Sequence, residues 1–314
     1  MKASSHPARC IVLDWGTTNF RALLVAANGA ILDRVETQDG IQSVPKGKFE
    51  AVLTRNIADW RSAYPALPIY AAGMITSRNG WIETPYVEAP ANAEALAAAI
   101  KWVKLAGGGL IGFLPGLADE SVKPFPDVMR GEETQLVGFG LEREMTAVLP
   151  GTHSKWARVG GGRIQRFRTF VTGEVFSVLS RHSFIAQLAK PQPEPNWNAF
   201  SMGLEASQGH TQLGGLLSNL FSVRTGWLAG KLTPDETSDY LSGLVVGMEF
   251  REAREMGWFK PGEGVGIIGG DPLVEVYRRA ASAFGLEPRL GPSDAAVRGA
   301  IAIAEIAERM GHGI

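Results

Sequence analysis

The sequence predicts an α/β protein with two related domains, and three observations support this fold class. The chain has 314 residues, which is long enough for two domains that each bury a core. Short apolar runs alternate with amphipathic segments, as strands alternate with helices in α/β folds. A unit of strand, Gly-Thr turn, strand, hairpin turn and strand begins at residue 10 and occurs again from residue 146. A repeated supersecondary unit indicates related domains, which we place at residues 1–140 and 141–314.

The first copy of this unit lies near the N-terminus. Its expected strands cover residues 10–13, 21–26 and 30–35. The first strand ends in the Gly-Thr turn at 14–18. Asn28 and Gly29 supply the hairpin turn between the other two strands, because both residue types tolerate positive φ.

Hydrophobic spacing predicts further helices and strands between the two copies. An amphipathic helix is expected over 49–64, since apolar side chains recur there every three or four residues. A strand over 68–73 leads into a polar loop. An alanine-rich helix is expected over 92–105, and a short strand over 110–114.

The second copy and the mostly helical remainder complete the predicted domain. Strands are expected over 146–149, 155–159, 163–171 and 264–268, and helices over 173–189, 235–256, 273–284 and 295–310. Thr233 or Asp235 caps the longest helix in this interpretation, and Ser293 with Asp294 caps the last one.

Composition excludes several classes of function. The net charge of −1 argues against a nucleic-acid partner, since such proteins usually carry a basic surplus. The single cysteine, Cys10, permits no intrachain disulfide. No apolar run is long enough to span a bilayer, and residues 1–9 lack the apolar core of a signal peptide. We therefore expect a cytoplasmic enzyme without membrane partners.

The turn at residues 14–18 has the composition of a phosphate-binding loop. Backbone N–H groups and two hydroxyls meet there at one tight turn, and Gly16 lets the backbone approach an oxyanion. Asp14 supplies the kind of carboxylate that binds the water shell of Mg²⁺. The alternative is an ordinary strand-to-turn junction, and this turn alone does not decide between the two.

The corresponding turn at residues 150–154 resembles the first turn but lacks its acid. An acidic and a non-acidic turn together could bind a nucleotide, with one metal on the Asp14 side. In this arrangement Lys155 either contacts a phosphate or only extends its aliphatic side chain along a strand to solvent. His153 is more often a hydrogen-bonding residue of the turn than a catalyst. Gly269 and Gly270 end a strand before a helix and could lie against adenosine, although such turns are often only tight connections.

Residues 129–135 place a cation and two carboxylates at the start of a helix. Acidic residues in a first turn are usually there for the helix dipole. The functional alternative is that Glu132 or Glu133 takes the proton of an attacking hydroxyl while Arg130 grips an anionic substrate. The polar loop at 73–81 offers hydrogen-bonding groups for a polyol, or it is a solvated loop whose Trp81 closes the edge of the core.

The order of these features resembles that of the sugar kinase and actin-like ATPase superfamily, including a final helix with small residues at 293–300. Five strings resemble 2-dehydro-3-deoxygalactonokinases more narrowly: Asp-Trp-Gly-Thr-Thr-Asn-Phe-Arg at 14–21, Ala-Gly-Met at 72–74, Met-Arg-Gly-Glu-Glu-Thr-Gln at 129–135, Pro-Gly-Thr-His-Ser-Lys-Trp at 150–156 and Thr-Gly-Glu at 172–174. The string at 129–135 is the most specific, and the resemblance covers nearly the whole chain. It implies two actin-like ATPase (ribonuclease H-like) domains around a central nucleotide cleft.

The resemblance also implies an activity and a set of site residues. Members of that family use ATP and Mg²⁺ to phosphorylate the 6-hydroxyl of 2-dehydro-3-deoxy-D-galactonate in galactonate catabolism. The residues expected to contact ATP are Gly16, Thr17, Thr18, Asn19, Arg21, Gly151, Thr152, His153, Lys155, Gly269 and Gly270. Those expected to contact the substrate are Gly73, Met74, Ser77, Arg78, Asn79, Trp81 and Arg130. Asp14 is the expected metal-side acid, and Glu132 is favoured over Glu133 as the base, where wider sugar kinases place an aspartate.

Three alternatives remain at this point. The first is a kinase of the same fold that acts on another sugar acid or on a neutral sugar. The second is a nucleotide-binding regulator without catalysis, and the third is a carboxylate phosphotransferase such as an acetate kinase. A small-molecule substrate is the expected partner, and a homodimer is an additional expectation.

Overall fold

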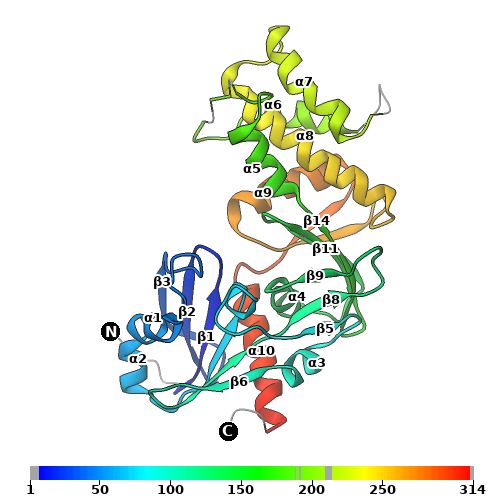
Figure 1. Ribbon diagram of the computed structural model, residues 1–314. Coiled ribbons are helices and arrows are strands. Elements are labelled where there is room, and N and C mark those ends of the chain that lie inside the picture. The colour runs from blue at the N-terminus through cyan, green and yellow to red at the C-terminus, as the bar shows by residue number, and fades with distance from the viewer. Residues whose placement is uncertain (1–6, 188, 191, 209–213, 312–314) are drawn as a thin grey trace. The chain divides into compact units, whose positions relative to one another are not determined.

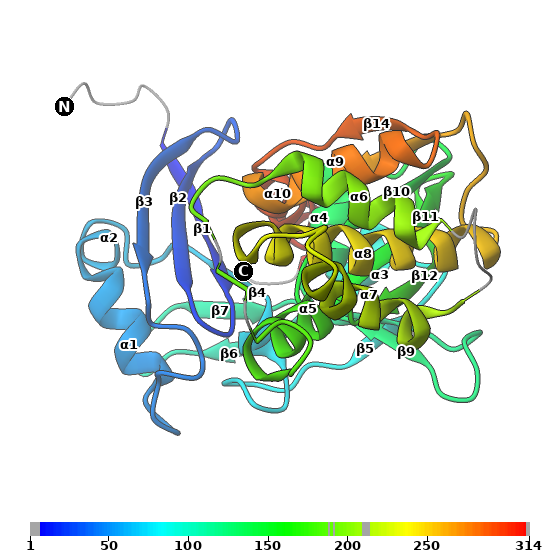
Figure 2. The same cartoon turned by 90° about the horizontal axis from the view of Figure 1, so that it is seen from above.

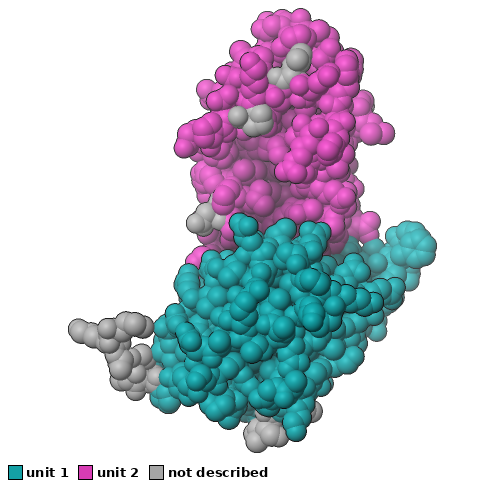
Figure 3. All heavy atoms as spheres, turned by 60° about the vertical axis from the view of Figure 1, so that its left-hand side comes forward, with its two compact units in different colours: residues 1–144, 158–167, 294–314 teal, residues 145–157, 168–293 magenta. Residues whose placement is uncertain are grey.

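The computed structural model describes residues 7–187, 189–190, 192–208 and 214–311, in two compact units. Figure 3 colours the units separately. Unit 1 contains the residues up to 144, the segment 158–167 and the residues from 294 onward, and unit 2 contains 145–157 and 168–293. Residues 1–6, on which part of the signal-peptide argument rests, and residue 188 of a predicted helix lie outside the described ranges.

The main sheet of unit 1 has the strand order β3-β2-β1-β4-β7-β6. Its strands are β1 (Ala8–Trp15), β2 (Phe20–Ala26), β3 (Ile31–Thr37), β4 (Ile69–Ala72), β6 (Lys101–Lys104) and β7 (Leu110–Phe113). The first three form an antiparallel meander, and β4 pairs parallel with both β1 and β7. A smaller sheet contains β5 (Tyr86–Glu88), β8 (Gly116–Asp119) and β9 (Asp127–Met129).

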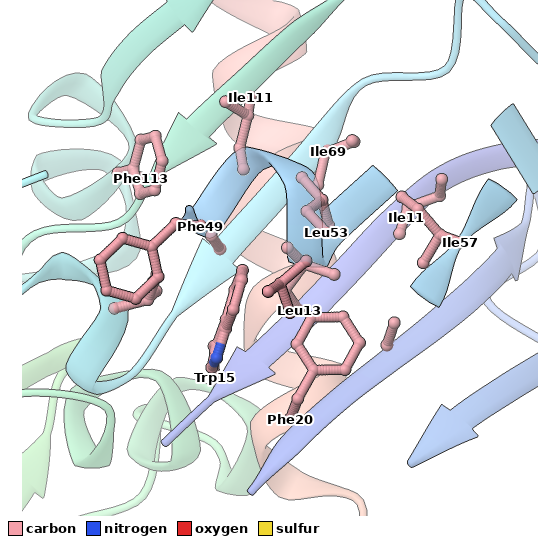
Figure 4. Close-up of a cluster of buried hydrophobic side chains, with 14 of the residues drawn as sticks. Ile11, Leu13, Trp15, Phe20, Phe49, Leu53, Ile57, Ile69, Ile111 and Phe113 are labelled. Carbon is pink, nitrogen blue, oxygen red and sulfur yellow. The ribbon is translucent and has the colours of Figure 1, made fainter. Parts of the chain in front are cut away.

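Side chains alternate between the two faces of this sheet. Ile11, Leu13 and Trp15 of β1 join the apolar cluster on one face, which α1 (Phe49–Asn56) and α2 (Ala58–Ala63) complete (Figure 4). The opposite face of β1 packs against α10 (Ala295–Arg309). Arg9, near the start of β1, donates hydrogen bonds to Glu305 and Glu308 of that helix. The remaining helical segments of unit 1 are η1 (Met74–Thr76), α3 (Ala93–Ala98) and α4 (Glu132–Phe139).

Unit 2 repeats this design. The sheet it contributes to has the order β12-β11-β10-β13-β14, from strands β10 (Met145–Leu149), β11 (Ser154–Gly160), β12 (Arg163–Phe170), β13 (Gly264–Ile267) and β14 (Glu287–Leu290). The end of β11 and most of β12, within residues 158–167, are grouped with unit 1. Its helices are α5 (Thr172–His182), α6 (Trp197–Ser207), α7 (Leu216–Leu228), α8 (Pro234–Glu255) and α9 (Asp271–Ala283). Helices α6, α8 and α9 bury their apolar side chains with those of the sheet, and α7 packs on α8 (Figures 1 and 2).

The repeated unit predicted from sequence is therefore confirmed. In each unit the third, second and first strands of a meander are followed by two strands added beside the first one, and β6 extends the unit 1 sheet by one more strand beside β7. This 3-2-1-4-5 order is that of the ribonuclease H-like fold, to which actin-like ATPase domains belong. The α/β class is confirmed as well, with mixed rather than purely parallel sheets.

Other predictions need correction. The helix expected over 92–105 ends at Ala98, and Lys101–Lys104 form strand β6 beside β7. The helix expected over 49–64 is broken at Ile57. The sequence did not reveal α6, α7 or the small sheet. The long helix α8 begins as expected, with a capping box between Thr233 and Glu236.

The division of the chain predicted at residue 140 differs from the observed grouping in three segments, because residues 141–144, 158–167 and those from 294 onward are grouped with unit 1. Helix α10 packs against α4, α3 and β1, and thus belongs to unit 1 although it ends the chain. A Cβ at Gly299 would lie 1.8 Å from the carbonyl oxygen of Thr134, and one at Gly138 would lie 1.9 Å from that of Ala295. Small residues in α10 therefore do allow the close packing expected of them, and their partner is α4.

No helix in the described ranges is long and apolar enough to cross a membrane.

Candidate active site

Two predicted site segments meet at one edge of the unit 1 sheet. Strands β1 and β4 run parallel, and Asp14 pairs in register with Ala72, so the Asp14 turn and the loop that follows Ala72 leave the sheet side by side. Gly73 has a φ of +88°, and a Cβ there would lie 3.0 Å from the Trp15 carbonyl oxygen and 3.4 Å from Asp14 Oδ1. The backbone at Gly73 therefore lies directly against the Asp14 carboxylate.

The start of α4 joins the same place. A Cβ at Gly131, the residue before α4, would lie 3.5 Å from Gly73 Cα. A cavity of about 30 Å³ lies between these elements, lined in part by Asp14, Gly131 and Gln135. Three strings that are distant in sequence, each predicted to carry chemistry, thus meet within unit 1.

The turn at residues 14–18, which we predict to bind phosphate and call the first phosphate turn, is closed by its own hydrogen bond and supported by a second loop. Gly16 N donates to the Asn19 carbonyl oxygen at 2.9 Å. From the loop after β3, Gly40 N donates to Thr18 O and Ile41 N to Gly16 O. A pocket of about 440 Å³ opens beside the turn. It is lined by Asp14, Gly16, Thr18, Asn19, Phe20, Arg21, Glu36, Thr37 and Gln38.

Gly40 supports the first phosphate turn through backbone contacts and was not predicted from the sequence. A Cβ there would lie 2.2 Å from the carbonyl carbon of Thr18 and 2.4 Å from Thr17 O, which are backbone atoms that cannot turn away. We expect Gly40→Ala to displace the phosphate turn and to lower kcat/KM for ATP by ~10²-fold, since small misplacements of reacting groups are costly. Steady-state kinetics with varied ATP measure this effect.

Gly107→Ala is the matched control, because a Cβ at Gly107 meets nothing within 4 Å. Wild-type kcat/KM for ATP in the Gly40 variant would show that the turn does not bind phosphate in this conformation.

Asp14 combines partial exposure with a nearby cation. Its side chain keeps 44% of its surface exposed, and its Oδ2 lies 3.8 Å from Arg21 Nη1. Burial raises the pKa of the Asp14 carboxyl, and Arg21 acts in the opposite direction. The loss of hydration is only partial at this exposure, so a ligand can still reach the carboxylate. Arg21 also pairs with Glu36 at 3.1 Å.

The donor set at Asp14 fits a magnesium ion that arrives with a nucleotide. The part of the chain that the structure describes contains no group of three or more His, Cys, Asp or Glu side chains able to bind a metal. A cation beside Asp14 therefore needs waters and phosphate oxygens to complete its shell, as Mg²⁺ characteristically does.

The two adjacent glutamates at the start of α4 have different environments. Glu132 is partly exposed, and its Oε2 accepts from Arg130 N at 3.0 Å. Glu133 is 1% exposed, and both of its oxygens accept from Gly131 N. Burial, and secondarily the Glu132 carboxylate, raise the pKa of Glu133 to about 8. At neutral pH Glu133 is therefore mostly protonated, while only Glu132 is open to solvent.

The structure places the Arg130 side chain against the loop after β4, which is predicted to bind the substrate. Its Nη1 donates to the hydroxyls of Thr76 and Thr84, its Nη2 donates to Thr84 O at 3.1 Å, and its guanidinium lies 4.4 Å from the Tyr86 ring centre. Arg130 Nε is buried without a partner among the described residues. Thr76 lies in the polar loop at 73–81 that the sequence singled out, whereas Thr84 belongs to none of the predicted site segments.

The loop after β4 is compact, and its predicted residues fall into two groups. Ser77 Oγ donates to Met74 O at 2.7 Å, which closes the turn, and the Trp81 ring packs on Phe49 and Phe113. Trp81 thus covers the core, as its alternative interpretation stated. Arg78 and Asn79 are exposed at the tip, where Arg78 pairs with Glu83.

The turn at residues 150–154, the second predicted phosphate turn, belongs to unit 2. It lies beside the turn that contains Gly269 and Gly270. Strands β10 and β13 run parallel, and a Cβ at Gly269 would lie 3.6 Å from Pro150 Cδ. Thr152 and His153 are exposed, and His153 Nε2 lies 2.6 Å from Glu174 Oε2. Lys155 is buried, and its Nζ donates to the His153 carbonyl oxygen. The structure therefore brings Gly151, Thr152, His153, Gly269 and Gly270 together at one edge of this sheet.

Fold and site define a protein of the sugar kinase and actin-like class, with one Gly-Thr turn, predicted to bind phosphate, on each of two related units. The model of the family described as 2-keto-3-deoxy-galactonokinase matches residues 14–303. This chain belongs to that family.

Individual relatives agree with this membership. The chain is 33% identical over 298 residues to a protein of Rhizobium meliloti (strain 1021) named as a probable 2-dehydro-3-deoxygalactonokinase, DgoK1, covering 93% of this chain and 95% of the relative. It is 33% identical over 295 residues to the 2-dehydro-3-deoxygalactonokinase of Escherichia coli (strain K12), covering 94% and 96%. A crystal structure from Sinorhizobium meliloti, provisionally described by the same enzyme name, matches with a TM-score of 0.84 and 32% identity over 96% of this chain and 99% of that one.

Proposed function

We propose that this protein transfers the γ-phosphoryl group of ATP to the 6-hydroxyl of 2-dehydro-3-deoxy-D-galactonate, in cytoplasmic galactonate catabolism. The observation that carries the proposal is the meeting of Asp14, Gly73 and Gly131 in a member of the 2-keto-3-deoxy-galactonokinase family. The hydroxyl oxygen bonds to the γ-phosphorus, and the bond from that phosphorus to the β,γ-bridging oxygen breaks. The hydroxyl proton passes to a carboxylate, and ADP leaves.

The two phosphate turns and their neighbours would bind ATP. In unit 1 the binding groups are the backbone N–H groups and hydroxyls of Gly16, Thr17, Thr18 and Asn19, with the Arg21 guanidinium. In unit 2 they are Gly151, Thr152, His153 and Lys155, with Gly269 and Gly270 on the adenosine side. Such groups neutralise the charge of the transferred phosphoryl group, and this supplies most of the rate in phosphoryl transfer.

Asp14 would hold Mg²⁺ through its exposed carboxylate oxygens. The ion, when bound, neutralises negative charge on the phosphate oxygens. Asp14 itself determines where that charge is neutralised, and the contact with Gly73 fixes the carboxylate beside the substrate loop.

Glu132 is the proposed base. It is the partly exposed member of the pair, whereas Glu133 is buried and already accepts from Gly131 N with both oxygens. A base must reach the proton that it removes, and this requirement favours the partly exposed Glu132 over the buried Glu133.

The substrate would contact the loop after β4 and the Arg130 guanidinium. Thr76 and Thr84 hold that guanidinium in place, which favours recognition of a fixed anionic group over a neutral sugar. The proposed contacts are Gly73, Met74, Ser77, Arg78, Asn79, Trp81 and Arg130, of which Trp81 contributes mainly as a wall of the loop.

An ADP-release assay over a panel of substrates tests the proposal. The panel contains 2-dehydro-3-deoxy-D-galactonate, other 2-keto-3-deoxy sugar acids, neutral hexoses, glycerol and acetate. We expect the highest kcat/KM with the galactonate derivative. Turnover with a neutral sugar alone would favour the kinase of another sugar, turnover with acetate alone the carboxylate phosphotransferase, and ATP binding without turnover the regulator.

A further inference from the structure

One buried carboxylate in unit 2 lies behind the second phosphate turn and outside the proposed set of site residues. Glu249 of α8 is 3% exposed. Its Oε1 accepts from Ser154 Oγ at 2.8 Å and from Trp156 Nε1 at 2.7 Å, and its Oε2 accepts from Tyr277 Oη at 2.6 Å. The Thr172 hydroxyl is a further hydrogen-bonding partner. A single side chain thus joins four donors from three other elements.

Two of these donors flank the phosphate turn. Ser154 is the last residue of the turn and opens β11, and Thr172 opens α5, which packs against the turn. The start of α5 packs against the turn itself, since a Cβ at Gly173 would lie 2.4 Å from Gly151 O. Glu174 N also donates to Thr152 O at 2.9 Å. Glu249 therefore contacts both segments between which the backbone at Thr152 is held.

The remaining donors extend the connection to the Gly-Gly turn. Tyr277 belongs to α9, whose N-cap is Gly270. Trp156 is fully buried and packs on Phe250 and Phe259. The elements that carry the predicted adenosine and phosphate contacts of unit 2 are thereby bound to one acceptor.

Apolar packing alone does not account for a glutamate at this position. It lies among the aromatic side chains of the unit 2 core, where loss of hydration raises the pKa of the Glu249 carboxyl. Burying a carboxylate is unfavourable, and a well-packed apolar residue is often as stable or more so. The Glu249 carboxylate differs from an apolar side chain in that it can accept several hydrogen bonds at once.

We propose that Glu249 is a positioning residue that fixes the second phosphate turn in its nucleotide-binding conformation. This inference rests on the proposed function, because it assumes that the turn binds ATP. Glu249 acts through Ser154 and Thr172 and contacts neither the nucleotide nor the sugar acid. Its loss should therefore weaken the nucleotide site and leave the substrate site, which belongs to unit 1, unchanged.

The test compares Glu249→Gln and Ser154→Ala with wild type. Glutamine keeps the shape but replaces one acceptor by a donor, and Ser154→Ala removes only the hydrogen bond on the side of the turn. We expect KM for ATP to rise about 10-fold in both variants while KM for the sugar acid stays within about 2-fold. Titration calorimetry with ADP should show the same loss of affinity.

Asp119→Asn is the matched control. Asp119 is another buried carboxylate, at 3% exposed, and it accepts from Ser121 and from Phe167 N in unit 1. Its variant should lower thermal stability without raising KM for ATP. Tyr277→Phe, which leaves the bonds to Ser154 and Thr172 in place, should raise KM for ATP less than Ser154→Ala does.

The outcomes separate the inference from the proposed function. Unchanged KM for ATP and unchanged ADP affinity in folded Glu249→Gln and Ser154→Ala, with only a lower Tm, would overturn the positioning role. A wild-type protein that neither binds ADP nor turns over ATP would instead remove the proposed function. A parallel rise in KM for ATP and for the sugar acid would also contradict the inference, since it would indicate general loosening.

Discussion

Asp14→Ala is expected to lower kcat by ~10³-fold or more and to leave the fold intact, since charge neutralisation at the phosphoryl group supplies most of the rate in such enzymes. The carboxylate is 44% exposed and its nearest cation, Arg21, is 3.8 Å away. Its removal therefore breaks no tight buried ion pair. Turnover is measured at saturating ATP, sugar acid and Mg²⁺, and folding by circular dichroism and Tm.

Asp59→Ala is the control for this variant, because Asp59 is an exposed acid on α2 of the same unit. Near-normal turnover in Asp14→Ala would remove Asp14 from the mechanism. A dependence on Mg²⁺ concentration that is the same in wild type and Asp14→Asn would remove it from the metal site.

The second large effect is expected on kcat, which should fall far more when Glu132 is replaced than when its neighbour Glu133 is. Glu132→Gln should lower kcat by ~10²- to 10⁴-fold, the usual contribution of a general base. Glu133→Gln should keep kcat within about 10-fold, since glutamine can still accept from Gly131 N and the native carboxyl is mostly protonated at neutral pH. Each variant is the control for the other, and the reverse ranking would assign the base to Glu133.

Glu133 also predicts how stability depends on pH. Its pKa is about 8 in the folded protein, above the ordinary value of 4.5. Between these values the folded state binds the proton more strongly, so this group makes the free energy of unfolding fall as pH rises from about 4.5 to about 8. The Tm of Glu133→Gln, relative to wild type, should therefore increase from pH 5 to pH 9. A constant difference would contradict a buried, proton-binding Glu133.

Much of the fold could be predicted because the repeated unit consists of local signals. Apolar strands, Gly-Thr turns and glycine hairpins occur at matching positions in both copies, and the two sheets of the structure share one order over five strands. The helix expected over 92–105 was wrong in its second half because the helical pattern of the alanines does not extend past Ala98. Lys101 to Lys104 pair with β7, and Trp102 and Val103 suit a strand better than the preceding alanines do.

The residues proposed to bind ligands could be predicted from sequence motifs, but the residues that hold these motifs in place could not. Asp14, Gly73 and Gly131 belong to motifs, and the parallel pairing of β1 with β4 brings two of them together. By contrast, Gly40 contacts the phosphate turn through the backbone, and Glu249 reaches Ser154 across 95 residues of sequence. Such contacts depend on the packing of whole elements, so no local pattern marks them. The grouping of α10 with unit 1 could not be predicted for the same reason, since it depends on packing against α4, α3 and β1.

The most direct test of the central claim is the identity of the product. The purified protein is incubated with ATP, Mg²⁺ and 2-dehydro-3-deoxy-D-galactonate, and the product is examined by ³¹P and ¹³C nuclear magnetic resonance. The account predicts one phosphate ester whose phosphorus couples to carbon 6, formed in equal amount with ADP. Phosphate on the carboxylate or on another hydroxyl, or ADP formed without a phosphorylated acid, would contradict it.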